Sequence, residues 1–192
     1  MFYPATGFTK GQVLDYYIRV SPVLLPHLQE RPLTLKRYPD GVEGGFFYEK
    51  RCPPYRPAWL QTAPMWSPSH DQNIHFCLVN DLPSLVWAVN LGDLELHTFL
   101  AKAPKLECPT MVAFDLDPGA PANILNCAQV ALWLKAKLDY LKLEAFPKSS
   151  GSKGLQVYVP LNTATSYDAT KAFAHTLAQH LEQEHPGQVV SK

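Results

Sequence analysis

Short strand patterns and longer helix patterns follow one another along this chain without the regular alternation that a parallel sheet requires. Apolar and polar residues alternate at 94–97 and 155–161, which is typical of half-buried strands. The mixture predicts an α+β fold with a mixed or antiparallel sheet flanked by helices, and we expect residues 1–192 to form a single domain. The predicted strands cover residues 33–37, 45–50, 74–79, 94–97, 111–116, 143–146 and 155–161. Predicted helices begin after Thr9 and cover 83–91, 121–141 and 168–184.

Capping residues and prolines set the expected limits of these elements. Thr9, with Gln12 three residues later, forms a capping-box pattern at the start of the first helix, and Asp168 is expected to cap the last one. Pro22 and Pro26 are expected to interrupt or kink the first helix. Five prolines between residues 52 and 68 predict an extended loop.

The composition excludes several classes of protein. Hydrophobic residues make up 46% of the chain, which excludes a disordered protein, and no apolar run approaches the roughly 18 residues of a membrane span. Seventeen basic residues balance seventeen acidic ones, which disfavours a simple basic nucleic-acid binder. The cysteines lack the close spacing of a zinc site, and no signal peptide is visible. We therefore expect four reduced thiols in a cytoplasmic protein.

Two carboxylates two residues apart are the strongest local signal. In a strand, Asp115 and Asp117 project to the same side while Leu116 faces the other way. Such a pair suits a hard divalent cation such as Mg²⁺ or Mn²⁺. The alternative is that a solvated aspartate before Pro118 simply starts a turn.

A polar turn at 149–154 is the second signal. Its glycines allow backbone amides to converge, its hydroxyls donate hydrogen bonds and Lys153 adds a positive charge, so the turn could hold a phosphate. The glycine spacing is not that of a Walker loop, and a strand follows where a helix is required. A plain Gly/Ser hairpin turn with an exposed lysine is the commoner use of such a segment.

Histidines and adjacent aromatic rings complete the candidates. His97 could donate to a phosphate or merely end a core strand. Rings at Phe46 and Phe47, with basic residues nearby, could stack on unpaired bases, although at least one of two adjacent strand residues normally faces the core. Five-residue spacing prevents three further histidines from sharing one metal ion, and we expect them to be solvated: His175, His180 and His185.

In order and spacing, six blocks resemble the polymerase domain of the bacterial ATP-dependent DNA ligase D, a branch of the archaeo-eukaryotic primase superfamily. The resemblance runs along nearly the whole chain and is far more specific than any single motif. The blocks are residues 3–10, 25–32, 46–50, 94–97, 114–119 and 150–155.

The resemblance implies a primase-polymerase-like fold and a metal-dependent nucleotidyltransferase that fills gaps with NTPs or dNTPs at 5′-phosphorylated DNA ends in non-homologous end joining. Expected partners are DNA ligase and Ku proteins, with no membrane association. Asp115 and Asp117 become the catalytic ligands of Mn²⁺ or Mg²⁺. The implied nucleotide-binding residues are His97, Ser150, Ser152, Lys153, Gly154 and Gln156. The implied DNA-binding residues are Lys10, Arg37, Phe46, Phe47 and Lys50.

Three departures from the family pattern weaken this expectation. Gln156 stands where the family has a phosphate-binding histidine, so we expect weaker triphosphate binding. The chain ends before the region of the family's third catalytic aspartate, which neither Asp139 nor Asp168 is expected to replace, and it starts just after another DNA-end lysine. Two alternatives stay open: a non-catalytic module that binds DNA ends, and a half-domain completed by a separately encoded chain.

Overall fold

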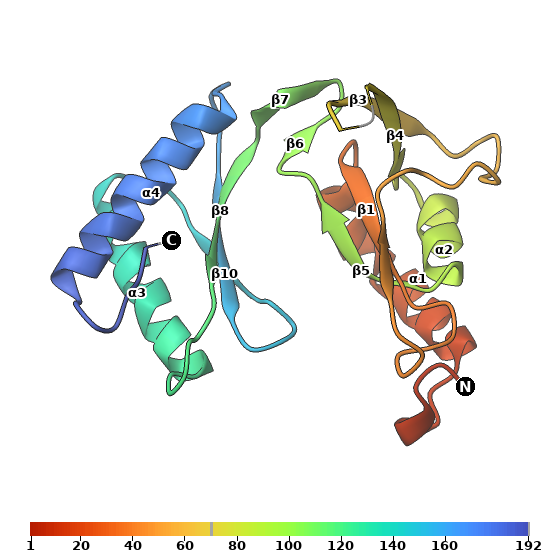
Figure 1. Cartoon of the computed structure of the whole chain (residues 1–192), viewed down its shortest axis with the longest axis horizontal. Coiled ribbons are helices and arrows are strands. Elements are labelled where there is room, and N and C mark those ends of the chain that lie inside the picture. The colour runs from red at the N-terminus through yellow and green to blue at the C-terminus, as the bar shows by residue number, and fades with distance from the viewer. Residues whose placement is uncertain (70, 192) are drawn as a thin grey trace. The chain divides into compact units, whose positions relative to one another are not determined.

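Strand β1 (Pro32–Arg37) lies at the centre of a five-stranded sheet in the computed structural model, which describes residues 1–69 and 71–191 (Figure 1). It pairs antiparallel with three strands: β2 (Phe47–Glu49), β4 (Gln72–Leu78) and β5 (Asp93–Thr98). Strand β3 (Thr62–Ser67) pairs antiparallel with β4 at the sheet edge. This sheet and its helices form one unit, up to Leu106, and the rest of the chain forms a second.

Helix α1 (Lys10–Leu28) continues through Pro22 and Pro26, so of the two expected effects, an interruption or a kink, the interruption is wrong. Pro22 has no N–H to donate to the carbonyl of Ile18, four residues earlier. The hydroxyl of Ser21 donates to that carbonyl instead, at 2.8 Å. A side chain therefore satisfies the backbone group that the proline leaves without its usual donor.

The helix caps agree with the sequence at one end of the chain and differ at the other. The capping box of Thr9 and Gln12 forms as predicted, with each side chain accepting from the other residue's backbone N–H. Helix α4 (Tyr167–Glu184) is capped by Ser166, and Asp168 lies in its first turn, so the predicted cap is two residues too late. Either residue type can cap a helix, and Ser166 is the one with the extended backbone.

The segment with five prolines is only partly a loop, because β3 occupies its last third. Pro64 lies inside β3, opposite His75 of β4. A proline is tolerated there because an edge strand pairs on one side only and needs fewer backbone donors.

Two of the four cysteines are joined in a disulfide, so the expectation of four free thiols is wrong. Cys52 and Cys77 are bonded with their Cα atoms 4.9 Å apart, while Cys108 and Cys127 are free. The chain after β2 returns to β4, where the backbone N–H of Cys52 donates to the carbonyl of His75 at 2.7 Å. The cysteines therefore do not support the expected cytoplasmic location.

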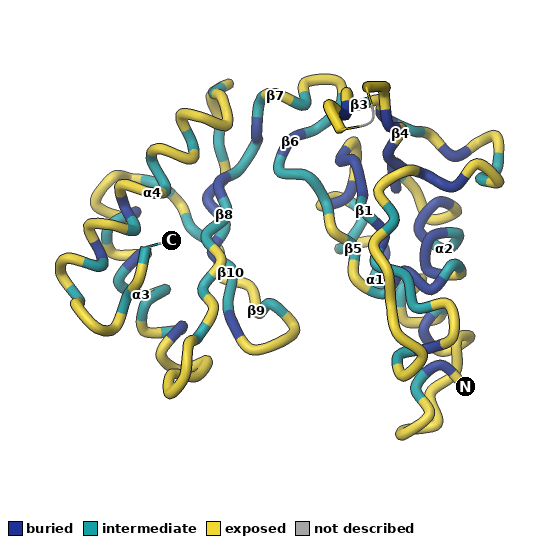
Figure 2. The backbone as a smooth tube through the Cα atoms, viewed as in Figure 1, coloured by how far each residue is buried: buried dark blue, intermediate teal, exposed yellow. Residues whose placement is uncertain are grey.

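Helices cover one face of the first sheet. Leu33 and Leu35 of β1 are almost fully buried and belong to a core with Leu85 and Val89 of helix α2 (Leu82–Asn90). Figure 2 shows this buried region along β1 and α2. Because strand residues alternate, Thr34 and Lys36 face the opposite side of the sheet.

The second unit repeats this arrangement with a smaller sheet. Strand β10 (Leu155–Pro160) lies between β8 (Met111–Leu116) and β9 (Phe146–Ser149), and all pairs are antiparallel. Val157 and Val159 pack with Leu134 and Leu138 of helix α3 (Ile124–Tyr140) and with α4. The core therefore lies on one side of this sheet too.

Other differences from the sequence-based expectations are local. The strand predicted at 143–146 begins only at Phe146, because pairing with β10 starts there. His185 is not simply solvated, since its ring stacks on Trp133 with centroids 3.6 Å apart. Three short elements were not predicted: the 3-10 helix η1 (Pro4–Thr6), β6 (Ala101–Lys102) and β7 (Lys105–Pro109). Within the described part of the chain, no helix is both long and apolar enough to cross a membrane.

The buried carboxyl of Asp93 gives the first testable prediction. It accepts a hydrogen bond from the backbone N–H of Lys36 at 2.8 Å, and burial raises its pKa to about 8. The native state therefore keeps a proton between about pH 4 and pH 8 that the unfolded chain releases, so this group makes stability fall as pH rises through that window.

We expect Asp93→Asn to remove this dependence, because the amide still accepts from Lys36 but does not titrate. Urea unfolding measures the free energy of unfolding of both proteins at pH 5 and pH 8. Between these pH values, the stability of the variant relative to wild type should rise by about 1 kcal/mol or more. The exposed Asp15→Asn is the matched control. Parallel pH dependence in wild type and Asp93→Asn would contradict the assignment.

Candidate functional site

Both carboxylates predicted to bind metal are exposed at the end of β8. Asp115 lies on the face of the sheet away from the helices, opposite Gln156 of β10, and Asp117 directly follows the strand. Leu116, between them, packs against the core. Neither aspartate takes part in an ion pair among the residues that the structure describes, so both are available to a cation or to water.

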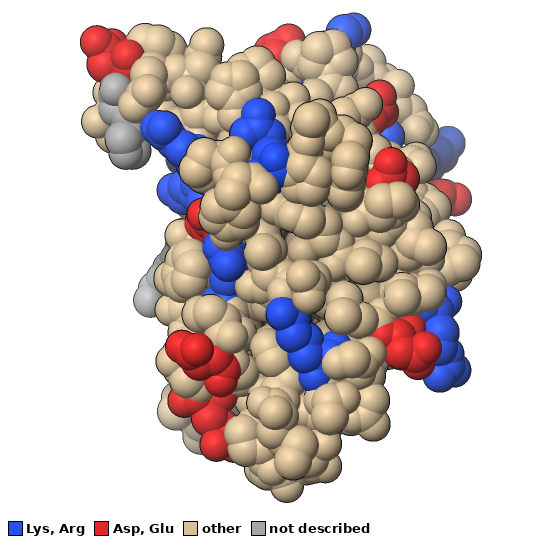
Figure 3. Space-filling view, turned by 90° about the vertical axis from the view of Figure 1, so that its right-hand side faces the viewer, with Lys and Arg blue, Asp and Glu red and all other residues tan. Residues whose placement is uncertain are grey.

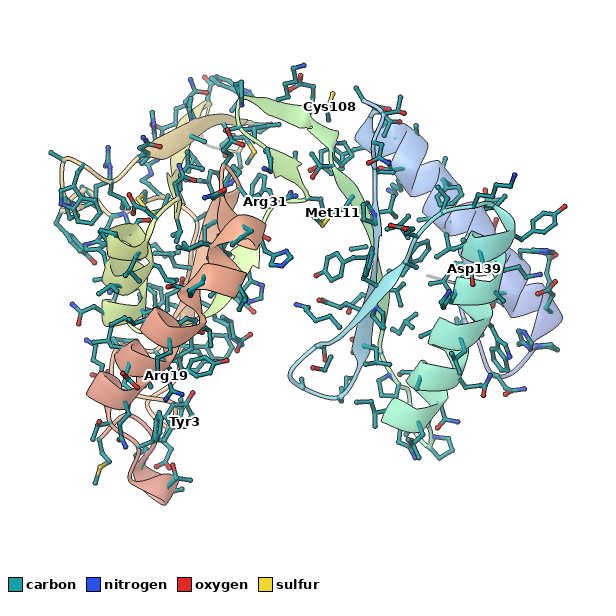
Figure 4. The ribbon with its side chains drawn as sticks, turned by 180° about the vertical axis from the view of Figure 1, so that it is seen from behind. Tyr3, Arg19, Arg31, Cys108, Met111 and Asp139 are labelled. Atoms are coloured by element: carbon teal, nitrogen blue, oxygen red, sulfur yellow. A yellow bond between two sulfur atoms is a disulfide. The ribbon has the colours of Figure 1, made fainter. Side chains whose placement is uncertain are left out.

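The donor set fits a divalent metal only in part. Two carboxylates next to each other supply the hard oxygen ligands that Mg²⁺ and Mn²⁺ prefer. In the described residues, no group of three or more His, Cys, Asp or Glu side chains is placed to share one ion. Asp139 lies on α3 (Figure 4), where it pairs with Lys135 at 2.6 Å, and Asp168 lies on α4. Neither supplies a third ligand.

The turn between β9 and β10 forms where the sequence predicts it. The hydroxyl oxygen of Ser150 accepts from the backbone N–H groups of Ser152 and Gly154, at 3.3 and 3.1 Å. The amides therefore converge as expected, but on an oxygen of the turn itself. Lys153 is exposed beside them.

Gly154 permits a close approach of this turn to the carboxylates. A Cβ added there would lie 2.3 Å from the carbonyl oxygen of Leu116 and 2.9 Å from Oδ1 of Asp117. Any other residue would push the turn away from the end of β8. The two sequence signals, the aspartate pair and the Gly/Ser turn, are thus parts of one edge of the second unit.

The same edge carries residues that the sequence analysis did not single out. Tyr158 donates to Oε1 of Gln156 at 2.8 Å, and Lys148 of β9 lies 5.6 Å from the centroid of the Tyr158 ring. Burial, and then the charge of Asp115, raise the pKa of the Tyr158 hydroxyl. Alternation along β10 could have placed Tyr158 beside Gln156, but only strand pairing brings Lys148 and Asp115 to them.

Cys127, near the start of α3, is buried. Burial, followed by the charge of Asp117, raises the pKa of the Cys127 thiol, while Lys153 lowers it. The side chains of Asp117 and Lys153 are therefore close enough to Cys127 to influence it electrostatically.

In the first unit, two of the predicted residues, Phe46 and His97, lie with four others on the open face of the sheet. We call this set the open-face cluster: Lys36, Tyr38, Phe46, Tyr48, Glu95 and His97. His97 is exposed, lies 3.4 Å from Oε2 of Glu95, and packs edge-on against Tyr48. It is therefore not the end of a core strand.

Glu95 connects the open-face cluster. Its carboxylate accepts from Lys36 at 2.5 Å and from the hydroxyl of Tyr38 at 2.9 Å. Burial disfavours the charge on Glu95, but these hydrogen bonds outweigh it and lower the pKa of the carboxyl. The spacing of two between Glu95 and His97 was the available signal, because it puts both on one face of a strand.

The predicted DNA-binding residues divide into two kinds. Phe46 and Phe47 are 52% and 44% exposed, so the expectation that one of them joins the core is wrong. Lys10 and Lys50 are exposed as well. Arg37 differs, because its guanidinium pairs with Glu49 at 2.6 Å and also donates to the hydroxyl of Tyr55 and the carbonyl of Leu91.

Basic residues form no continuous patch on the face of the molecule shown in Figure 3. Among the residues that the structure describes, lysines and arginines are separated there by uncharged surface and by acidic groups. A polyanion on this face would depend on a few individual cations.

Comparison with known proteins identifies one family. A sequence model of the LigD primase-polymerase domain matches residues 9–192. The multifunctional non-homologous end joining protein LigD of Mycolicibacterium smegmatis is 35% identical over 97% of this chain and 24% of its own length. The bifunctional LigD of Bacillus subtilis is 34% identical over 93% of this chain and 28% of its own length. The chain therefore spans about a quarter of the length of these relatives.

A solved structure gives the same result. The polymerase domain from Mycobacterium tuberculosis ligase D in complex with DNA is similar with a TM-score of 0.88 and 36% sequence identity. The match covers 97% of this chain and 67% of that one. The predicted α+β fold is thereby confirmed.

The close approach at Gly154 leads to the second prediction. We expect Gly154→Ala to destabilise the chain by about 1–3 kcal/mol, because the new methyl group meets the backbone oxygen of Leu116. Gly119→Ala is the control, since a Cβ there meets nothing within 4 Å, and it should change stability by less than about 0.5 kcal/mol. Equal melting curves for the two variants would show that β8 and the turn are not packed as described.

Proposed function

Because the chain belongs to the family of LigD primase-polymerase domains, we propose that it is a nucleotidyltransferase domain acting on DNA ends in non-homologous end joining. The observation that carries this proposal is the pair of exposed carboxylates, Asp115 and Asp117, beside the turn at Gly154. Such an edge offers oxygen ligands for Mg²⁺ or Mn²⁺ next to hydrogen-bond donors for a triphosphate. The proposed place of action is the cytoplasm.

The proposed reaction joins a nucleotide to a primer. The primer 3′-hydroxyl attacks the α-phosphorus of an NTP or dNTP, a new P–O bond forms, and the bond to the β-phosphate oxygen breaks to release pyrophosphate. A bound divalent metal would neutralise the charge that develops on the phosphate oxygens. Asp115 and Asp117 would hold the metal, and Lys153 would provide a positive charge for the triphosphate.

The turn residues and Gln156 complete the proposed nucleotide contacts. A phosphate oxygen replaces the hydroxyl of Ser150 as acceptor for the amides of Ser152 and Gly154. Gln156, oriented by Tyr158, donates through its amide nitrogen but carries no charge, so it binds phosphate more weakly than the family's histidine. The proposed role of His97 in binding triphosphate rests on the family resemblance alone.

The first unit carries the proposed contacts to DNA. Exposed rings at Phe46 and Phe47 offer stacking surfaces for unpaired bases, which is worth about 1–3 kcal/mol per base. Lys10 and Lys50 are free to contact phosphates. Proposed protein partners are a DNA ligase and Ku, which act at the same ends.

A non-catalytic module that binds DNA ends is the second candidate. Two observations favour it: no third carboxylate joins Asp115 and Asp117 in the described residues, and Gln156 stands where the family has a histidine. A third ligand supplied from outside the described residues would reconcile these observations with catalysis.

The aspartates provide the decisive test. Asp115→Ala and Asp117→Ala should each abolish manganese-dependent primer extension, because one carboxylate cannot hold the metal, while binding to a 5′-phosphorylated gapped duplex stays within about twofold of wild type. Asp139→Asn, at the C-terminal end of α3, is the matched control and should extend primers normally. If wild type adds no nucleotide, and Asp115→Ala binds DNA as wild type does, the chain is a non-catalytic module that binds DNA ends.

Lys10 is the subject of a separate prediction. Replacing it by Ala should weaken discrimination in favour of a 5′-phosphorylated end by about three- to tenfold at low salt, with a smaller effect at high salt, because the contact is an exposed ion pair. Binding titrations with phosphorylated and unphosphorylated gapped duplexes measure this. Equal affinity of wild type for the two ends would disprove the role of Lys10.

A further inference from the structure

The two cations nearest the exposed phenylalanines are already paired with carboxylates. Nζ of Lys36 lies 2.5 Å from Glu95, and Nη1 of Arg37 lies 2.6 Å from Glu49. Both basic side chains are only 13% exposed. A cation that is nearly covered and already neutralised has little charge to offer a DNA phosphate.

Each of these cations also lies against one phenylalanine ring. Lys36 and Arg37 are neighbours on β1, so their side chains leave opposite faces of the sheet. Nζ of Lys36 lies 4.2 Å from the ring centroid of Phe46, and the guanidinium carbon of Arg37 lies 5.3 Å from that of Phe47. Both distances are within the range of cation–π attraction. Two adjacent cations thus contact two adjacent rings, one pair on each face.

On the open face, Lys36 is surrounded by aromatic rings. Its ammonium lies 5.6 and 5.9 Å from the ring centroids of Tyr38 and Tyr48. The ring of Phe46 is 5.4 Å from that of Tyr38 and 5.7 Å from that of Tyr48. Lys36 therefore lies among three aromatic rings, and the ring of Phe46 is half exposed.

We propose that Lys36 and Arg37 are positioning residues that hold Phe46 and Phe47 in place for stacking on unpaired bases, and that neither binds a phosphate. This inference rests on the proposed function, because it assigns DNA bases to the rings. It replaces the expectation that Arg37 binds DNA directly. The phosphate contacts are left to lysines that are exposed and form no ion pair among the described residues, Lys10 and Lys50.

The test compares Lys36→Met, Phe46→Ala and the double variant of the full chain. Affinity for a duplex with a single-stranded overhang is measured over a series of salt concentrations. Lys36→Met should bind about three- to tenfold more weakly, because the ring loses its cation–π partner. If Lys36 acts through the ring, the double variant should bind no more weakly than Phe46→Ala alone.

The salt dependence separates positioning from phosphate binding. Lys36→Met should leave the slope of log affinity against log salt unchanged, whereas loss of a phosphate contact reduces it by about 0.7 for single-stranded DNA. Lys36→Arg should restore affinity, since it keeps both the charge near the ring and the partner for Glu95. Lys50→Met, a lysine exposed next to β2, is the matched control for loss of a charge at this site.

Three results would overturn the inference: wild-type affinity in Lys36→Met, additive losses in the double variant together with a reduced salt slope, or no effect of Phe46→Ala. Lys36→Gln keeps a donor for Glu95 without the charge, and it takes the place of Lys36→Met if that variant does not fold. Primer extension that depends on Asp115 can persist in each of these cases, so failure of this inference is distinguishable from failure of the proposed function.

Discussion

Helices cover one face of each sheet, and the period of two along a strand therefore assigns every second side chain to the uncovered face. In β1 this puts Leu33 and Leu35 in the core and Lys36 on the open face. In β8 it puts Val112 in the core and Asp115 on the open face. The open-face cluster and Asp115 follow from this constraint, because the same strands supply the core and these side chains.

The charged residues of the two units differ in whether they are paired with an opposite charge. Lys36 and Arg37 of β1 form ion pairs with Glu95 and Glu49 and also contact aromatic rings. The carboxylates at the end of β8, in contrast, have no basic partner among the described residues. Ion pairs of the first kind lower the cost of placing charge beside apolar rings. Aspartates without such partners repel each other, and a cation relieves that repulsion. A neutral composition thus conceals two quite different local situations.

Structural features that depend on residues close together in the sequence were predicted well, whereas pairings between distant residues were not. The capping box at Thr9, the strand at 111–116 and the turn before Leu155 needed only neighbouring residues. The disulfide of Cys52 and the strand around Pro64 each depend on a partner that the local sequence does not identify. The continuation of α1 through Pro22 is an exception, because the neighbouring Ser21 satisfies the carbonyl of Ile18. Glu95 was missed because its importance comes from Lys36 and Tyr38, more than fifty residues earlier.

The amino-acid sequence by itself determined the α+β class, the family resemblance and the two carboxylates at one strand end, since periodicity and spacing are properties of the chain. Tertiary structure alone decided which cations are free. Arg37 and Lys10 have the same charge and were both expected to bind DNA, but Arg37 folds against Glu49 while Lys10 stays exposed. The availability of a charge depends on what strand pairing brings within a few ångströms, and composition carries no record of those distances.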